Sequence, residues 1–72
     1  MIIMFKSPRQ ARVKGRKFQQ YSSVLFGMGL EKPEFRAIGE KDGNIVVHPD
    51  DLSSPPKEPF TLRRDIVEFL ES

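Results

Sequence analysis

The clearest structural signal in the chain is the stretch EFRAIGEKDGNIVVH, residues 34–48. On both sides of the central Lys41-Asp42-Gly43, larger apolar side chains occupy alternate positions, and a period of two is typical of β-strands. Glycine after aspartate is a common turn sequence between two strands. The stretch therefore predicts a β-hairpin.

Two turns fit this hairpin, and they differ in which side chains share a face. A three-residue loop with Gly43 in the left-handed region pairs Glu40 with Asn44. It also gathers four apolar side chains on one face, namely Phe35, Ala37, Ile45 and Val47. A two-residue turn at Asp42 and Gly43 is the alternative, but it divides these side chains between the two faces. The pattern therefore favours the three-residue loop.

The N-terminal part of the chain predicts a second pair of strands. Residues 2–5 form a short apolar run, and Pro8 cannot donate a hydrogen bond within a sheet. We therefore expect a strand over residues 2–6, a turn over 7–10 and a strand over 11–16, paired as a hairpin. Basic residues alternate along the second strand, so three cations would line one of its faces: Arg12, Lys14 and Arg16.

Residues 17–27 fit a helix, because apolar side chains recur there at helical spacing: Phe18, Tyr21, Val24, Leu25 and Met28. Gly27 and Gly29 would end this helix. A strand is the alternative, since the same residues also have good strand propensity.

A final helix is expected from Thr61, as its cap, through residue 71. One face of this helix would carry Leu62, Ile66, Phe69 and Leu70. Three prolines between residues 53 and 59 predict an extended connector before it.

These elements predict an α+β fold with a small antiparallel sheet. The sheet would consist of the N-terminal strands and the 34–48 hairpin, covered by the C-terminal helix and by the second helix near 17–27. A chain of 72 residues is too short for two independent cores. We therefore expect one domain over residues 1–72, with the connector at 53–59.

The charges of the chain are unevenly distributed. Residues 1–30 hold six basic and no acidic side chains, whereas residues 31–72 hold six basic and ten acidic ones, so +6 is followed by −4. The net charge of +2 hides this asymmetry. The candidate binding residues are the six cations of the first segment: Lys6, Arg9, Arg12, Lys14, Arg16 and Lys17.

A row of cations predicts contact with the phosphates of nucleic acid, because release of condensed counterions supplies affinity without reading a base sequence. Phe18 and Tyr21 could stack on bases, but a chain this small favours placing them in its core. The alternative function is a small accessory or regulatory protein. It would bind an acidic partner protein through the same basic face, or a partner through its C-terminal helix.

Composition argues against several other classes. The sequence has no cysteine, which excludes disulfide scaffolds, thiolate metal sites and a cysteine nucleophile, and favours a cytoplasmic location. His48 with Asp50 and Asp51 makes a poor ligand set for a metal. No motif indicates an enzyme, a cofactor or a membrane span, and none is diagnostic of a known family. A homodimer is an option for so small a core.

Overall fold

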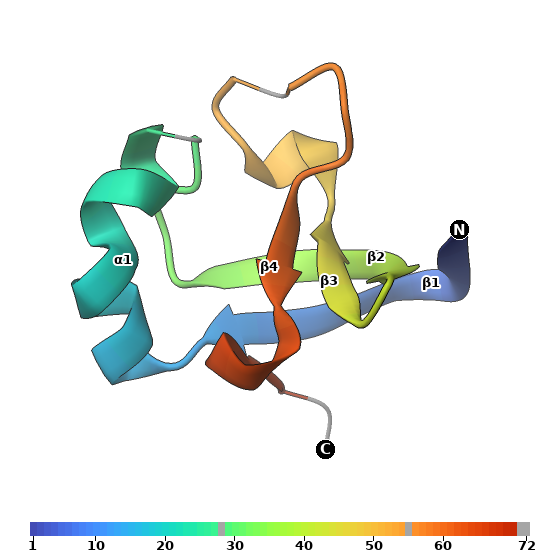
Figure 1. Ribbon diagram of the computed structural model, residues 1–72, viewed down its shortest axis with the longest axis horizontal. Helices are drawn as coiled ribbons and strands as arrows, with labels where there is room; N and C mark the ends of the chain where they lie inside the picture. The colour runs from blue at the N-terminus through green and yellow to red at the C-terminus, as the bar shows by residue number, and fades with distance from the viewer. Residues whose placement is uncertain (28, 55, 71–72) are drawn as a thin grey trace.

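The computed structural model describes residues 1–27, 29–54 and 56–70. Within them, one curled antiparallel sheet has the strand order β4-β3-β2-β1-β5 (Figure 1). Its strands are β1 (Ile2–Val13), β2 (Glu34–Lys41), β3 (Asn44–Val47), β4 (Thr61–Arg63) and β5 (Val67–Phe69). One α-helix, α1 (Gly15–Gly27), follows β1, and two 3-10 turns precede β4 and β5, namely η1 (Pro49–Asp51) and η2 (Arg64–Ile66).

The hairpin predicted at residues 34–48 is confirmed as β2 and β3, but the favoured turn was wrong. Lys41 pairs with Asn44, so the turn has two residues, and both have positive φ angles, 52° for Asp42 and 84° for Gly43. The register then shifts between Ala37 and Gly39. This bulge restores the pairing of Ala37 with Val47, and all four predicted apolar residues are buried in one core, namely Phe35, Ala37, Ile45 and Val47.

The predicted N-terminal hairpin is wrong, because residues 2–13 form the single long strand β1. Met4 pairs with Gly39 and Arg9 with Ala37, so the β1 residues between them bulge away from β2. Pro8 lies in this bulge, where the lack of an N–H costs no hydrogen bond of the sheet. The strand therefore bends at Pro8 instead of turning back.

The predicted C-terminal helix is also wrong. β4, η2 and β5 occupy residues 61–69 in its place, so the expected pair of covering helices is reduced to α1. Leu62 and Ile66 are buried, as the helical pattern required. However, β4 pairs with β3 and β5 pairs with β1. These pairings give hydrogen-bond partners to the outer backbone groups of β3 and β1, which a C-terminal helix would have left unpaired.

The helix predicted at 17–27 is confirmed and begins two residues earlier, at Gly15. After Gly27 the chain reverses through Gly29, whose φ is 97°. Its N–H donates to the carbonyl of Phe26 at 3.0 Å, and the N–H of Leu30 donates to the carbonyl of Leu25 at 2.8 Å. The two glycines therefore end the helix as expected.

The core lies inside the curl of the sheet and is covered by Leu25 from α1. Its buried members come from every strand: Ala11, Val13, Leu25, Leu30, Phe35, Ala37, Ile45, Val47, Leu52, Phe60, Leu62, Ile66 and Val67. Residues 53–54 and 56–60 connect η1 to β4 without a helix or strand. Three positions used in the sequence predictions lie outside the described residues, namely Met28, Pro55 and Glu71. The single-domain organisation stays a prediction.

Candidate functional site

Three of the six candidate cations lie together where β1 gives way to α1. β1 ends at Val13, Lys14 follows it, and Arg16 and Lys17 lie in the first turn of the helix. Lys14 is fixed there by its backbone, because its N–H donates to the carbonyl of Ile66 at 2.9 Å and its carbonyl accepts from Phe18 at 2.8 Å. We call Lys14, Arg16 and Lys17 the basic corner.

The basic corner has no neutralising partner among the described residues. None of its three side chains forms an ion pair there, and the first turn of α1 contains no acidic residue. The N-terminus of a helix already carries a positive partial charge, so cations at this end oppose the stability of the helix. The same arrangement raises the positive potential at the corner.

The other three candidate cations are used differently. Arg12 of β1 donates from Nε to Oε1 of Glu68 at 2.7 Å, across the pairing of β1 with β5. The guanidinium of Arg9 lies 3.8 Å from the ring centroid of Phe69 and 5.3 Å from that of Phe5. Lys6 is exposed in the bulge of β1. Arg9 and Arg12 therefore help to hold β5 against β1.

The expected row of Arg12, Lys14 and Arg16 on one strand face is wrong. The strand period holds as far as Val13, where Ala11 and Val13 are fully buried and Arg12 is exposed. Beyond Val13 the chain turns into α1, so Arg16 follows helical geometry. The cations form a corner and not a line.

Sequence reasoning missed two cations beside this corner, Arg63 and Arg64, because it placed them in a helix. They lie at the junction of β4 and η2, and η2 lies beside the start of α1 (Figure 1). Arg63 forms an exposed ion pair with Asp65 at 3.0 Å, and Arg64 forms one with Glu40 at 3.4 Å. Exposed pairs of this kind contribute little stability, so an incoming anion can compete for these side chains.

Acidic side chains gather at the opposite end of α1. A hollow of about 280 Å³ next to Gly29 is lined by four carboxylates, those of Glu31, Glu34, Asp50 and Asp51. In Figure 1 this end, with η1, lies away from the start of the helix. The charge asymmetry of the sequence is therefore also a spatial asymmetry, and the helix dipole has the same direction.

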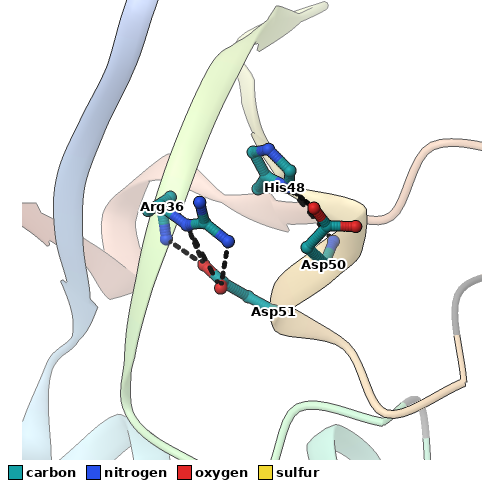
Figure 2. Close-up of polar contacts among 4 residues, drawn as sticks. All are labelled: Arg36, His48, Asp50 and Asp51. Atoms are coloured by element: carbon teal, nitrogen blue, oxygen red, sulfur yellow. Dashed lines mark hydrogen bonds and ion pairs between the residues drawn. The ribbon is translucent and has the colours of Figure 1, made fainter.

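One partly buried ion pair organises the acidic end. The carboxylate of Asp51 accepts from the backbone N–H of Arg36 at 2.6 Å and from its Nη2 at 2.9 Å (Figure 2). The side chain of Asp51 is 22% exposed, so water cannot easily replace these bonds. This contact fastens η1 to β2 and gives Asp51 a structural role.

The pKa of Asp51 is below its ordinary value. Burial is the largest single influence and raises the pKa, but the hydrogen bonds from the side chain and backbone of Arg36 and its positive charge together outweigh burial. A lowered carboxyl pKa stabilises the fold above the unfolded-state pKa, about 3.9, and this stabilisation is lost as the pH falls through the folded-state pKa.

We therefore predict that Asp51→Asn lowers the free energy of unfolding by about 1–3 kcal/mol at neutral pH. The difference from the original protein should shrink as the pH is lowered below about 4. Urea unfolding at several pH values measures both effects. Asp50→Asn is the matched control, because the side chain of Asp50 is 78% exposed on the same turn. Equal losses in the two variants would contradict a structural role for Asp51.

His48 has a local structural partner. Its Nδ1 accepts from the backbone N–H of Asp50 at 3.0 Å, so the imidazole caps η1 (Figure 2). Within the described residues, no group of three or more His, Cys, Asp or Glu side chains is placed to hold a metal ion.

The aromatic residues near the basic corner belong largely to the core. Phe18 and Tyr21 are half-buried and pack against it. Phe26 contacts Phe18 edge to face, with 5.9 Å between ring centroids. The corner therefore presents charge, whereas the two rings proposed for stacking face largely inward.

Comparison of the chain with protein families, curated proteins and solved structures found no match. In the described part of the chain, no helix has the length and apolar character needed to cross a bilayer.

Proposed function

We propose that this protein is a non-enzymatic binding module that contacts the phosphates of nucleic acid through the basic corner. The observation that carries this proposal is the grouping of Lys14, Arg16 and Lys17, without an acidic partner, at the positive end of α1. The backbone of η2, which follows Arg63, is bonded to that of Lys14 at this corner. The absence of cysteine favours a cytoplasmic site of action.

The proposal concerns phosphate contact and not base recognition. Side chains that neutralise phosphates give affinity and orientation, whereas sequence is read by groups that reach base edges. Phe18 and Tyr21 pack against the core, so they give no support to stacking on single strands. We therefore expect binding to duplexes with little dependence on their sequence.

The salt dependence of binding gives the first test. If the three cations each neutralise one phosphate, log K should fall with log salt with a slope of about −2.7, so that affinity drops about 40-fold between 50 and 200 mM salt. Fluorescence anisotropy with a labelled duplex measures this slope. No binding to duplex or single strand at low salt would sink the proposal.

Charge reversal at the corner is the second test, and it separates function from stability. Lys14→Glu with Arg16→Glu should remove most of the duplex affinity. The slope of log K against log salt should become shallower by the contribution of about two phosphate contacts. Because a glutamate in the first turn suits the helix dipole, the doubly substituted protein should be at least as stable as the original. Thermal unfolding checks this expectation.

Lys41→Glu with Lys57→Glu is the matched control. It changes the net charge by the same amount, and both lysines are exposed outside the corner. Equal loss of affinity in both double variants would show that only net charge matters, which contradicts a site at the corner. Capture of an acidic protein that survives nuclease treatment, without duplex binding, would favour the accessory-protein alternative. The C-terminal helix of that alternative does not exist.

A further inference from the structure

A second surface, separate from the phosphate site, lies between α1 and the edge of the sheet. It is a groove of about 280 Å³ whose lining is mainly apolar. The apolar lining residues are Tyr21, Val24, Leu25, Phe60, Leu62 and Ile66. Four of these belong to the buried core, so the floor of the groove is fixed by the packing of the whole protein.

The wall of the groove formed by α1 is unusual in being apolar and open to water. Val24 is 64% exposed, although it precedes the core residue Leu25 in the last turn of the helix. Tyr21, one turn earlier, is half-buried. A segment lying in the groove would remove this apolar surface from water, which is a favourable change.

The opposite wall is the free edge of β4. The N–H of Val47 donates to the carbonyl of Phe60 at 2.9 Å, and the pairing continues with Ile45 opposite Leu62. Bonded pairs alternate in an antiparallel ladder, so Leu62 bonds to β3 while the backbones of Thr61 and Arg63 point away from it. An unpaired edge of this kind is a template for an added strand.

Two residues on this edge have backbone groups that can bond to an added strand. The N–H and C=O of Thr61 and the N–H of Arg63 face outward at the normal spacing of two residues. Thr61 and Arg63 also line the groove. A chain bonded to this edge would therefore direct alternate side chains into or out of the apolar space.

The size of the groove favours a peptide segment over a small-molecule ligand or cofactor. Pockets for drug-sized ligands and cofactors usually have volumes of about 300–1,000 Å³. The groove lies just below this range and is open along an edge strand, which suits one or two side chains of an extended segment.

The charges around the groove indicate the chemistry of that segment. Arg63 lines it, with a side chain that is 72% exposed. Lys17 precedes Tyr21 by four residues and Val24 by seven, which places the three on one face of α1. Acidic residues beside the apolar anchor would complement both cations.

We propose that the groove and the edge of β4 bind an extended peptide segment of another protein, which carries an apolar anchor flanked by acidic residues. The segment adds a strand to β4, and its anchor side chain lies between Val24 and Leu62. The anchor and backbone contacts of this site come from residues outside the basic corner, so the site is distinct from the phosphate contact proposed above, although Lys17 contributes charge to both.

The test uses a short fluorescent peptide in which glutamates flank a central Val-Leu-Val run. Two variants accompany it, one with lysine in place of each glutamate and one with N-methylated backbone amides. We expect the acidic peptide to bind about tenfold or more tightly than either variant, because the first loses charge complementarity and the second loses strand hydrogen bonds. The amides of Thr61 and Arg63 should become protected from exchange on binding.

Val24→Asn should weaken binding of the acidic peptide about tenfold or more, while duplex affinity stays unchanged. Ile3→Asn is the matched control, because Ile3 is also 64% exposed but lies on β1. Arg63→Glu should shift the preference towards the lysine peptide. Retention of duplex binding in the Val24→Asn protein shows that the two sites are separate.

Several results would overturn the inference. One is acidic-peptide binding that is absent, no tighter than that of the lysine peptide, or unaffected by Val24→Asn. Another is protection at Arg16 and Lys17 in place of Thr61 and Arg63, which would place the peptide on the phosphate site. A dimer in light scattering that Val24→Asn dissociates would identify a second copy of this chain as the occupant.

Discussion

Replacing Gly39 with alanine is expected to lower the free energy of unfolding by about 3 kcal/mol or more. A Cβ at this position would collide with the carbonyl oxygen of Ile3 and lie 3.2 Å from Cα of Met4. Both contacts are to backbone, which cannot rotate away as a side chain can. β1 would have to move off β2 at the pairing of Met4 with Gly39, next to the point where both strands change register. Urea unfolding measures the loss.

Gly15→Ala is the control for this prediction, since it makes the same chemical change where there is space. A Cβ at Gly15 meets nothing within 4 Å, and the residue begins α1. Alanine suits a helix better than glycine, so this variant should be as stable as the original or slightly more stable. If both variants lose the same stability, the close approach of β1 to Gly39 is not the cause.

The hairpin shows how far local patterns predict this fold. Alternation identified the strands and the four side chains that enter the core. It did not identify the two-residue turn, because the pattern implied a constant register between β2 and β3. The bulge near Ile38 changes that register, and it lies next to Gly39, which a third strand approaches closely. Such contacts are not visible in a local window of sequence.

The errors at the two ends of the chain have the same origin. Pro8 predicts a turn only if the sheet requires a backbone N–H donor at that position, and the bulge of β1 removes that requirement. The spacing of Leu62 and Ile66 fits a helix, but it fits equally a strand followed by a 3-10 turn. The strands are favoured over the helix because β4 pairs with β3 and β5 pairs with β1. Such pairing between segments distant in sequence overrides local propensity.

The sequence predicted which residues belong to the candidate site but not how they are arranged. The +6 segment identified the residues of the basic corner, but the pairing of Arg12 with Glu68 joins residues 56 positions apart. The stacking of Arg9 on Phe69 likewise depends on β5, which the sequence did not predict. One signal was present in the sequence: Arg63 and Arg64 suited a helix start poorly, which argued against the helix assigned there.

Phe35→Ala is expected to be the most damaging single substitution in the core, with a loss of about 3–5 kcal/mol. Phe35 is 3% exposed, lies on the central strand β2 and pairs with Ala11, a fully buried residue of the neighbouring strand β1. Typical stabilities of about 0.05–0.15 kcal/mol per residue give a chain of 72 residues about 4–11 kcal/mol in total. The variant should therefore be partly unfolded at room temperature, with weak near-ultraviolet circular dichroism and a much lower urea midpoint.

Phe26→Ala is the matched control, because it removes the same ring from a position that is 52% exposed. Its described ring contact is the edge-to-face pair with Phe18, and such a pair contributes about 0.5–1.5 kcal/mol. The two substitutions should therefore differ by at least about 1.5 kcal/mol. A similar loss in both would mean that the ring of Phe35 does not fill the centre of the curled sheet, and the inward placement of β2 would have to be abandoned.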